Sequence, residues 1–135
     1  MQKGKYSVKR RFGNKGEDLA CMFLMKHGHR IIYRNYLKRV GEIDIVSLKN
    51  NVFHFTEVKT VSRETGNCVT HEIFGHRPEE NIDRRKMLHM KRVIDVFLSE
   101  KRIYNREIQI NVATVLFDTR RRVWKVGMIE NVILG

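Results

Sequence analysis

The stretch GEIDIVSLKNNVFHFTEVK, residues 41–59, decides the expected fold. Hydrophobic and polar residues alternate on both sides of Asn50 and Asn51, which is the period-two pattern of β-strands. Because asparagine tolerates the positive φ that a two-residue hairpin turn requires, this pair predicts a turn between two antiparallel strands. A turn centred there places Asp44 directly opposite Glu57.

Two carboxylates in directly opposed positions repel each other, because their Cβ atoms lie only about 4.5–5.5 Å apart. A shared proton, a neighbouring lysine or a divalent cation held by oxygen ligands would each relieve this repulsion. The cation does so most completely. The expected pair of Asp44 and Glu57 therefore indicates a metal site on the hairpin.

Lys59 lies two residues after Glu57, on the same face of the expected strand. Phosphodiester hydrolysis needs a metal to activate water and neutralise charge, with a further cation near the attacking water. Two carboxylates and a lysine supply that set. The alternative is that Asp44 is solvated in a turn, Glu57 lies at the surface and Lys59 pairs with Glu42, since E-x-K alone is a common pattern.

The composition indicates one small, strongly basic domain. With 135 residues and no repeat or linker, the chain predicts a basic mobile arm at 1–13 and a single domain at 14–135. The formal charge of +12 favours polyanions, and nucleic acid is the expected partner. Cys21 and Cys68 suggest no disulfide framework, and no apolar stretch suits a signal peptide or membrane span, so a cytoplasmic location without membrane contact is expected.

The remaining patterns predict an α/β domain in the order αβββαβ with a terminal strand. Asn14 is expected as the N-cap of the first helix and Gly28 as its stop, and Gly41 lets the chain turn into the hairpin. In chain order, the expected elements are a helix at about 14–27, a strand at 30–37, the hairpin at 41–59, a long loop at 60–78, a helix at 79–101, a strand at 107–118 and a closing strand at 123–129.

Glu17 is a further candidate ligand. It lies in the first turn of the expected first helix and shares a face with Ala20, Cys21 and Leu24, so a helix docked on the hairpin would carry its carboxylate to the metal. A glutamate three residues after Asn14 also completes a capping box, which needs no further purpose. The residues alone leave both interpretations open.

The sequence GNKGEDLACMFLMKHGHRIIYRNYLKRVGEID, followed by FTEVKT, resembles the YraN-like family of small bacterial proteins. That family looks like a member of the PD-(D/E)xK nuclease superfamily, whose restriction-endonuclease-like core is a central mixed β-sheet flanked by helices. The resemblance covers about residues 13–98 and depends on KGE, GEID and EVK in that order. It implies that the main domain is a single endonuclease-like unit.

The resemblance, which is shared with archaeal Holliday junction resolvases, implies a magnesium- or manganese-dependent endonuclease that cuts structured or branched DNA. It implies that Glu17, Asp44 and Glu57 bind the metal. It also implies that Lys59 lies beside the attacking water and takes part in catalysis with these three acids.

The expected contacts with the DNA backbone are basic and carry no sequence readout. Lys86 matches a basic position in the family's second helix, and the turn at Arg120, Arg121 and Arg122 would hold phosphates together with the arm. Arg63 is a further expected contact with the nucleic acid, although family members often place an arginine directly after the EVK lysine and three residues separate Arg63 from that lysine here. A two-fold homodimer would let two sites cut opposing strands.

Two alternatives belong to other functional classes. One is a nucleic-acid-binding protein, for DNA or RNA, that keeps the nuclease fold but hydrolyses nothing. The other is a basic protein associated with RNA, although no aromatic pattern of an RNA-recognition sheet supports it. Cleavage assays separate the nuclease from both.

Overall fold

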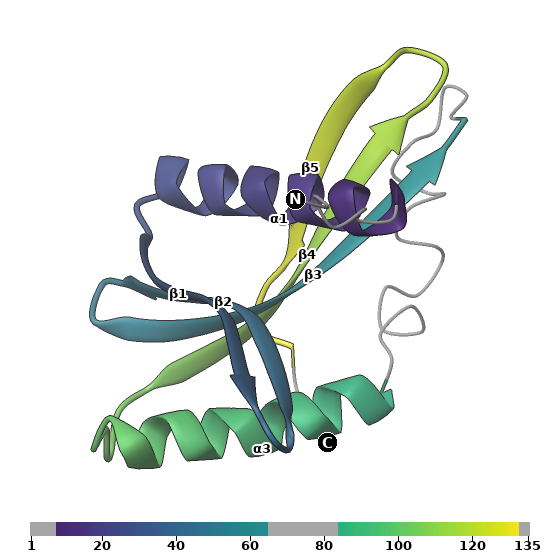
Figure 1. Ribbon diagram of the computed structural model, residues 1–135. Coiled ribbons are helices and arrows are strands. Elements are labelled where there is room, and N and C mark those ends of the chain that lie inside the picture. The colour runs from purple at the N-terminus through teal and green to yellow at the C-terminus, as the bar shows by residue number, and fades with distance from the viewer. Residues whose placement is uncertain (1–7, 65–83, 133–135) are drawn as a thin grey trace, which may run out of the picture.

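The computed structural model describes residues 8–64 and 84–132 as a five-stranded mixed sheet with one helix on each side (Figure 1). Its order confirms the expected α/β class and the arrangement αβββαβ with a terminal strand. The elements are α1 (Val8–Lys26), β1 (Arg30–Lys38), β2 (Gly41–Lys49), β3 (Val52–Arg63), α3 (Arg84–Glu100), β4 (Ile108–Asp118) and β5 (Val123–Ile129).

The strands follow their sequence order across the sheet, from β1 to β5. Neighbouring strands are antiparallel except β3 and β4, which are parallel. A parallel pair needs a crossover connection, and α3 belongs to the crossover between these two strands. As a result, α3 lies on one side of the sheet and α1 on the other (Figure 1).

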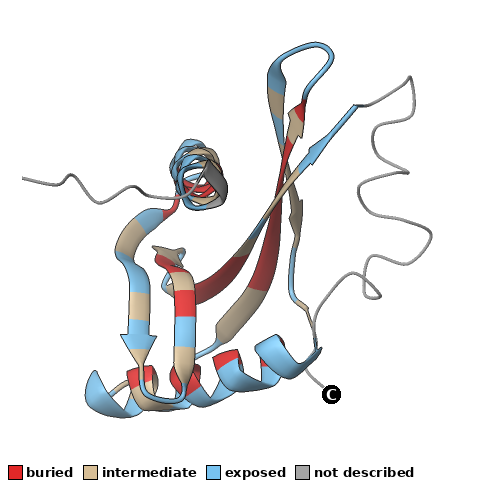
Figure 2. Cartoon of the chain, turned by 45° about the vertical axis from the view of Figure 1, so that its right-hand side comes forward, coloured by how far each residue is buried: buried red, intermediate tan, exposed pale blue. Residues whose placement is uncertain are grey.

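Each helix packs against its own hydrophobic core. Buried residues concentrate in the central strands and on the helix sides that face the sheet (Figure 2). Burying one such side chain stabilises the fold by about 1.5–3 kcal/mol. The core beneath α3 consists of Ile43, Val46, Phe53, Phe55, Met87, Met90, Val93, Ile94, Phe97 and Val112. The core beneath α1 consists of Ala20, Cys21, Leu24, Ile45, Ala113 and Val115.

The β2–β3 hairpin turns where the sequence predicts. Asn50 and Asn51 both adopt positive φ angles, of 50° and 65°, as a tight hairpin turn requires. The ladder then runs in the expected register, with Leu48 opposite Phe53, and its last pair is Ile45 with Thr56. It ends one step before the carboxylates: β2 continues along β1, and β3 continues along β4.

The first helix begins earlier than expected. Its first residue is Val8, so the prediction that Asn14 is the N-cap is wrong. The physical reason is a contact that the local pattern does not show: the Phe12 ring packs against Trp124, with centroids 5.2 Å apart. Residues 8–13 of the expected arm are thus helical, and residues 1–7 lie outside the described part.

The end of this helix agrees with the prediction. Gly28 has a φ of +87°, and the His29 amide donates to the Leu24 carbonyl at 3.0 Å, closing a Schellman-type cap. Gly41 likewise has a φ of +153° at the turn into β2. A side chain there would also approach Val93 of α3 to 3.1 Å, so the position has two reasons to be glycine.

Two further boundaries differ from expectation. β3 extends to Arg63 rather than ending at Lys59, because its last residues pair with β4 as far as Asp118. The second helix is described from Arg84, and most of the expected loop, with Cys68 and the first residues of the expected helix, lies outside the described residues. No helix in the described ranges is long and apolar enough to cross a membrane.

Candidate active site

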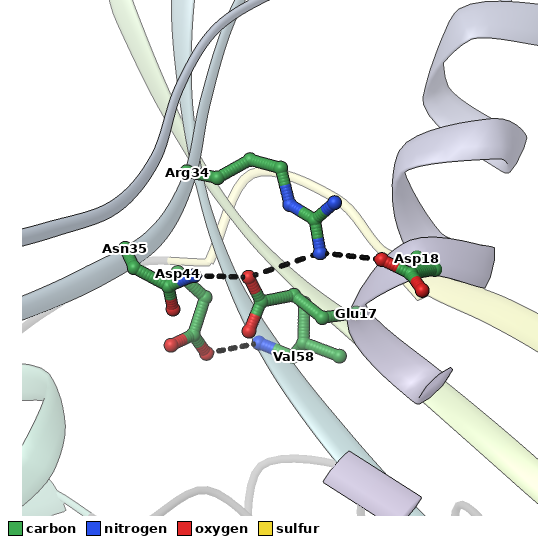
Figure 3. Close-up of polar contacts among 6 residues, drawn as sticks. All are labelled: Glu17, Asp18, Arg34, Asn35, Asp44 and Val58. Carbon is green, nitrogen blue, oxygen red and sulfur yellow. Dashed lines mark hydrogen bonds and ion pairs between the residues drawn. The ribbon is translucent and has the colours of Figure 1, made fainter. Parts of the chain in front are cut away.

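The candidate site lies at the fork where β2 and β3 separate. Asp44 is the first residue of β2 outside the ladder that β2 forms with β3. Its Oδ2 accepts a hydrogen bond of 2.8 Å from the Val58 amide (Figure 3). That amide lies beyond the last β2–β3 pair, so the carboxylate accepts from a donor that the ladder no longer uses. The fork therefore fixes the orientation of Asp44.

Glu57 adjoins Asp44, as the hairpin pattern predicts. Glu57 is only 7% exposed, and its carboxyl group is hydrogen-bonded to that of Asp44. Burial, followed by the charge of Asp44, raises the pKa of Glu57 to about 8. A proton held between the two oxygens relieves the repulsion near neutral pH, which is one of the three arrangements expected from the sequence.

Lys86 of α3 supplies a second counter-charge. Its ammonium forms an ion pair with Glu57. Desolvation lowers the pKa of Lys86, but contacts with Glu57 and Asp44 outweigh this effect and raise the pKa above its ordinary value. The lysine beside the acids thus comes from the opposite helix, whereas Lys59 is exposed on β3.

Glu17 reaches the same fork from α1. Its Oε1 accepts a hydrogen bond of 2.8 Å from the side-chain amide of Asn35 and one of 3.4 Å from Arg34 (Figure 3). The Arg34 guanidinium also forms an ion pair with Asp18, at 2.7 Å. Burial and then the charge of Asp44 raise the pKa of Glu17, so these two acids interact electrostatically. Because the helix starts at Val8, the capping-box explanation of Glu17 is wrong.

Asn35 is a residue of this site that sequence reasoning missed. It has a φ of 53° inside β1, which few non-glycine residues adopt and which orients its amide towards Glu17. The flanking pairs, Arg34 with Ile45 and Tyr36 with Ile43, place it across from Asp44. The available signal was an asparagine within a strand-like run, since strands are depleted in asparagine.

Gly16 is a second missed residue. A Cβ built at Gly16 would lie 2.0 Å from the Oγ1 of Thr60 and 2.7 Å from its Cγ2. Only glycine lets α1 approach β3 this closely without a shift of one element. The contact fixes the height of α1 over the sheet and therefore the position of the neighbouring Glu17.

The acids open into a cleft of about 720 Å³ between α1, the start of β2 and the start of α3. Asp44, Glu17 and Glu42 line it together with the cations Arg10 and Lys86. The remaining lining residues are Phe12, Gly13, Asn14, Asn35, Leu37, Val58 and Thr60. A phosphate group could therefore approach the acids beside positive charge.

Asp44, Glu57 and Glu17 offer only oxygen atoms, which are the ligands that a hard cation prefers. Over residues 8–64 and 84–132, however, no three histidine, cysteine or acidic side chains are arranged so as to hold a metal ion. A proton and Lys86 take the role of the counter-ion at Glu57, and Asn35 and Arg34 donate to Glu17. To bind here, a metal ion would have to replace the proton and Lys86 at Glu57, and Asn35 and Arg34 at Glu17.

The predicted DNA-binding residues fall into two places. Arg63 at the end of β3 lies beside the β4–β5 turn, because its carbonyl accepts 3.0 Å from the Thr119 amide. The buried Asp118 orders that turn by accepting from the amides of Arg120 and Arg121 at 3.0 and 3.1 Å. Lys86 instead lies at the acids, so its predicted phosphate contact stays a prediction.

Fold and site define an α/β domain with a cluster of acids in a partly basic cleft. The family model described as Uncharacterised protein family UPF0102 matches residues 16–118. UPF0102 proteins of Caldicellulosiruptor saccharolyticus and Moorella thermoacetica are 34% and 35% identical over 123 residues, covering 91% of this chain and 97% and 95% of those proteins. The chain belongs to the UPF0102 family.

This membership confirms the family part of the resemblance, since the YraN-like proteins are UPF0102 proteins. The matched range contains Glu17, Asp44, Glu57 and Lys59. A UPF0102 protein of Campylobacter jejuni, 32% identical over 103 residues, covers 76% of this chain and 81% of its own length. Membership of the PD-(D/E)xK nuclease superfamily stays a prediction.

Proposed function

We propose that this protein is a metal-dependent nuclease that hydrolyses phosphodiester bonds of DNA, with structured or branched DNA as its substrate. The observation that carries the proposal is the contact of the buried Glu57 with Asp44, which is half-buried and lines the cleft. Burying an acid beside a second acid costs free energy that a hydrophobic residue would not cost. Groups of this kind, with shifted pKa values at a cleft, are concentrated at functional sites.

Asp44, Glu57 and Glu17 would hold a magnesium or manganese ion. Such an ion supplies activation of water and neutralisation of charge on the phosphate. To bind it, the pair of Asp44 and Glu57 must release the proton that they share, and Lys86, which balances their remaining negative charge, must leave Glu57. The freed Lys86 ammonium would then lie beside the cleft, where a phosphate oxygen can accept from it.

Other residues of the chain act by positioning. The Val58 amide fixes one oxygen of Asp44, and the Asn35 amide fixes one oxygen of Glu17. Arg10 contributes positive charge to the cleft wall, which favours entry of a phosphate backbone. Lys59 has its proposed place beside the attacking water only if the acids rearrange around the ion.

The experiment that tests hydrolysis compares a four-way junction, a flap, a duplex and a single strand, each with and without magnesium or manganese. The proposal expects Asp44→Asn to lower cleavage by about a hundredfold or more, and Lys59→Ala to lower it as well. Glu42→Gln is the matched control, because Glu42 is another acid of the cleft but does not belong to the pair of Asp44 and Glu57. Cleavage that survives Asp44→Asn and Lys59→Ala would come from a contaminant.

Metal binding is tested separately by calorimetric titration of manganese into the wild type and Glu57→Gln. The proposal expects heat from the wild type and much less from the variant. Because removal of a proton accompanies binding, the wild-type heat should also change with the ionisation enthalpy of the buffer. Equal heats from both proteins would remove the metal from the mechanism.

A nucleic-acid-binding protein without hydrolytic activity is the second candidate. The ion pair of Lys86 with Glu57 favours it, because a lysine already compensates the buried charge. This candidate expects salt-dependent binding of DNA or RNA that no metal alters, and no cleavage of any of the four substrates. The nucleic acid that copurifies at low salt tells which of the two polymers is bound.

A further inference from the structure

We propose that Phe12, Phe117 and Trp124 form a binding surface for an unpaired DNA strand, which this surface leads into the cleft. We call these three residues the aromatic platform. The inference rests on the proposed function for its choice of DNA and adds the state of the strand that is bound. Phe12 and Trp124 lie outside residues 16–118, the range that the family model matches.

The three rings come from three elements and lie next to one another. Phe12 of α1 and Phe117 of β4 each lie tilted by about 35° against Trp124 of β5, with centroid distances of 5.2 and 4.8 Å. The Phe12 and Phe117 centroids are 6.4 Å apart. All three side chains are only partly buried, so the platform retains exposed aromatic surface.

Phe12 connects this platform to the acids. Its ring contacts Trp124 and Phe117, and the same residue lines the cleft that contains Asp44 and Glu17. A strand whose base lies on the platform would therefore have its neighbouring phosphate at the mouth of the cleft. Among the described residues, only Phe12 both belongs to the aromatic platform and lines the cleft.

The charge around the platform complements a phosphate backbone. Every charged residue in the two segments that carry its edge, residues 10–15 and 119–125, is basic. They are Arg10, Arg11, Lys15, Arg120, Arg121, Arg122 and Lys125. The adjacent Asp118 is buried and accepts from the amides of the turn, so it contributes little exposed negative charge.

Aromatic rings flanked by arginines bind single strands through stacking and through contacts with phosphates. Stacking on one ring contributes about 1–3 kcal/mol per base. Bases within a duplex already stack on each other and offer no free face, so the platform discriminates in favour of unpaired nucleotides. Junctions and flaps, the substrates proposed above, expose such nucleotides.

The competing explanation is that the platform only anchors the first turns of α1 to β4 and β5. Under that explanation a conservative change of Phe12 lowers stability but leaves DNA binding unchanged. The two explanations differ in a direct readout, because Trp124 is the only tryptophan of the chain. A base that stacks on the platform changes its fluorescence.

The test titrates an oligothymidylate and a duplex of equal length into the wild type in EDTA, following Trp124 fluorescence and the anisotropy of a labelled strand. We expect quenching by the single strand and tighter binding of it than of the duplex. Phe12→Leu should weaken single-strand binding about 5- to 150-fold and leave duplex binding unchanged. Phe12→Tyr, which keeps the ring, should retain it.

Phe23→Leu is the matched control, since Phe23 is a partly exposed aromatic residue of α1 whose ring stacks on His27. Binding that saturates without any change in Trp124 fluorescence would overturn the inference, even if no variant folds. Equal affinity for single strand and duplex would also overturn it, as would preference for an RNA strand. Because the titration contains EDTA and measures binding alone, its outcome is independent of the test of hydrolysis.

Discussion

The two ends of the β2–β3 hairpin belong to one continuous alternating sequence, yet they differ in hydrogen bonding and in what they bury. At the turn, the ladder is regular and hydrophobic pairs such as Val46 with Phe55 face each other. At the open end the ladder stops, and Asp44 and Glu57 adjoin beside residues of both helices. Local alternation therefore determines the closed end, whereas tertiary partners determine the open end.

The closed end should show the largest effect on stability. Phe55 is fully buried, so Phe55→Ala is expected to lower the free energy of unfolding by about 3–5 kcal/mol through a cavity in the α3 core. Chemical denaturation monitored by circular dichroism measures it. Phe55→Leu should cost clearly less, and an alanine variant as stable as the wild type would contradict this account of the closed end.

Low pH should destabilise the closed end of the hairpin through His29, whose Nδ1 lies 2.9 Å from the Ser47 hydroxyl of β2. Burial lowers the pKa of His29 to about 4, and His54 and Lys49 add to this shift. The unfolded chain thus binds one more proton between pH 6.5 and 4, so stability falls as the pH drops through that window. The expected loss is about 2–3 kcal/mol.

The measurement compares urea unfolding at pH 7 and at pH 4 for the wild type and His29→Gln. Titrating acids affect both proteins, so the difference between them isolates the histidine. His27→Gln is the control, because His27 is exposed on the same segment. An identical pH dependence of wild type and His29→Gln would contradict the expected shift.

At the open end, two glycines of α1 differ in what an added Cβ would meet. Gly16→Ala should destabilise the protein by about 1–3 kcal/mol, because its Cβ would lie 2.0 Å from the Thr60 hydroxyl oxygen. Gly13→Ala is the matched control: a Cβ there meets nothing within 4 Å, and alanine favours the helix by about 1 kcal/mol. Thermal unfolding of both variants measures the difference.

A second change tests the cause of the Gly16 effect. Thr60→Ala removes the Oγ1 and Cγ2 atoms that a Cβ at position 16 would meet, so it should recover part of the stability lost in Gly16→Ala. Strictly additive effects in the double variant would show that α1 does not depend on this close contact.

The smallest expected effect on stability concerns the ion pair across the open end. Lys86 is 59% exposed in its side chain, and Glu57, whose pKa is raised to about 8, can remain protonated without it, so Lys86→Met should change stability by no more than about 1 kcal/mol. Under the proposed function it should nevertheless strengthen manganese binding, because the ammonium no longer competes at Glu57. Calorimetry measures both proteins, with the exposed Lys91→Met as control, and weaker binding in Lys86→Met would mean that the lysine supports the ion.

Local chemistry made most of the fold predictable. The positive φ of Asn50 and Asn51 and the helix stop at Gly28 follow from what these residue types tolerate. The start of α1 was not predictable in this way, because Phe12 folds the first turns onto Trp124, more than a hundred residues later in the chain. Helix boundaries set by such distant contacts leave little local signal.

In the candidate site, too, contacts within the hairpin were predictable, whereas contacts between separate elements were not. Hairpin spacing predicted the contact of Asp44 with Glu57, since a period of two brings opposed residues together. It did not predict that Lys86 would pair with Glu57, nor that Asn35 would hold Glu17, because both partners depend on how separate elements dock. The hydrolytic roles of the acids and of Lys59 stay predictions.

The parallel pairing of β3 with β4 has a consequence for the order of assembly during synthesis. The β1–β2 and β2–β3 hairpins join neighbouring segments and can close as soon as they leave the ribosome, whereas β3 must wait for α3 and β4. Until then Glu57 lies next to Asp44, which repels it, but it lacks both the contact with Lys86 and the burial that α3 and β4 provide. In a nascent chain, the surroundings of the acid pair are therefore completed last, and the first half of the polypeptide needs the second half to reach its final structure there.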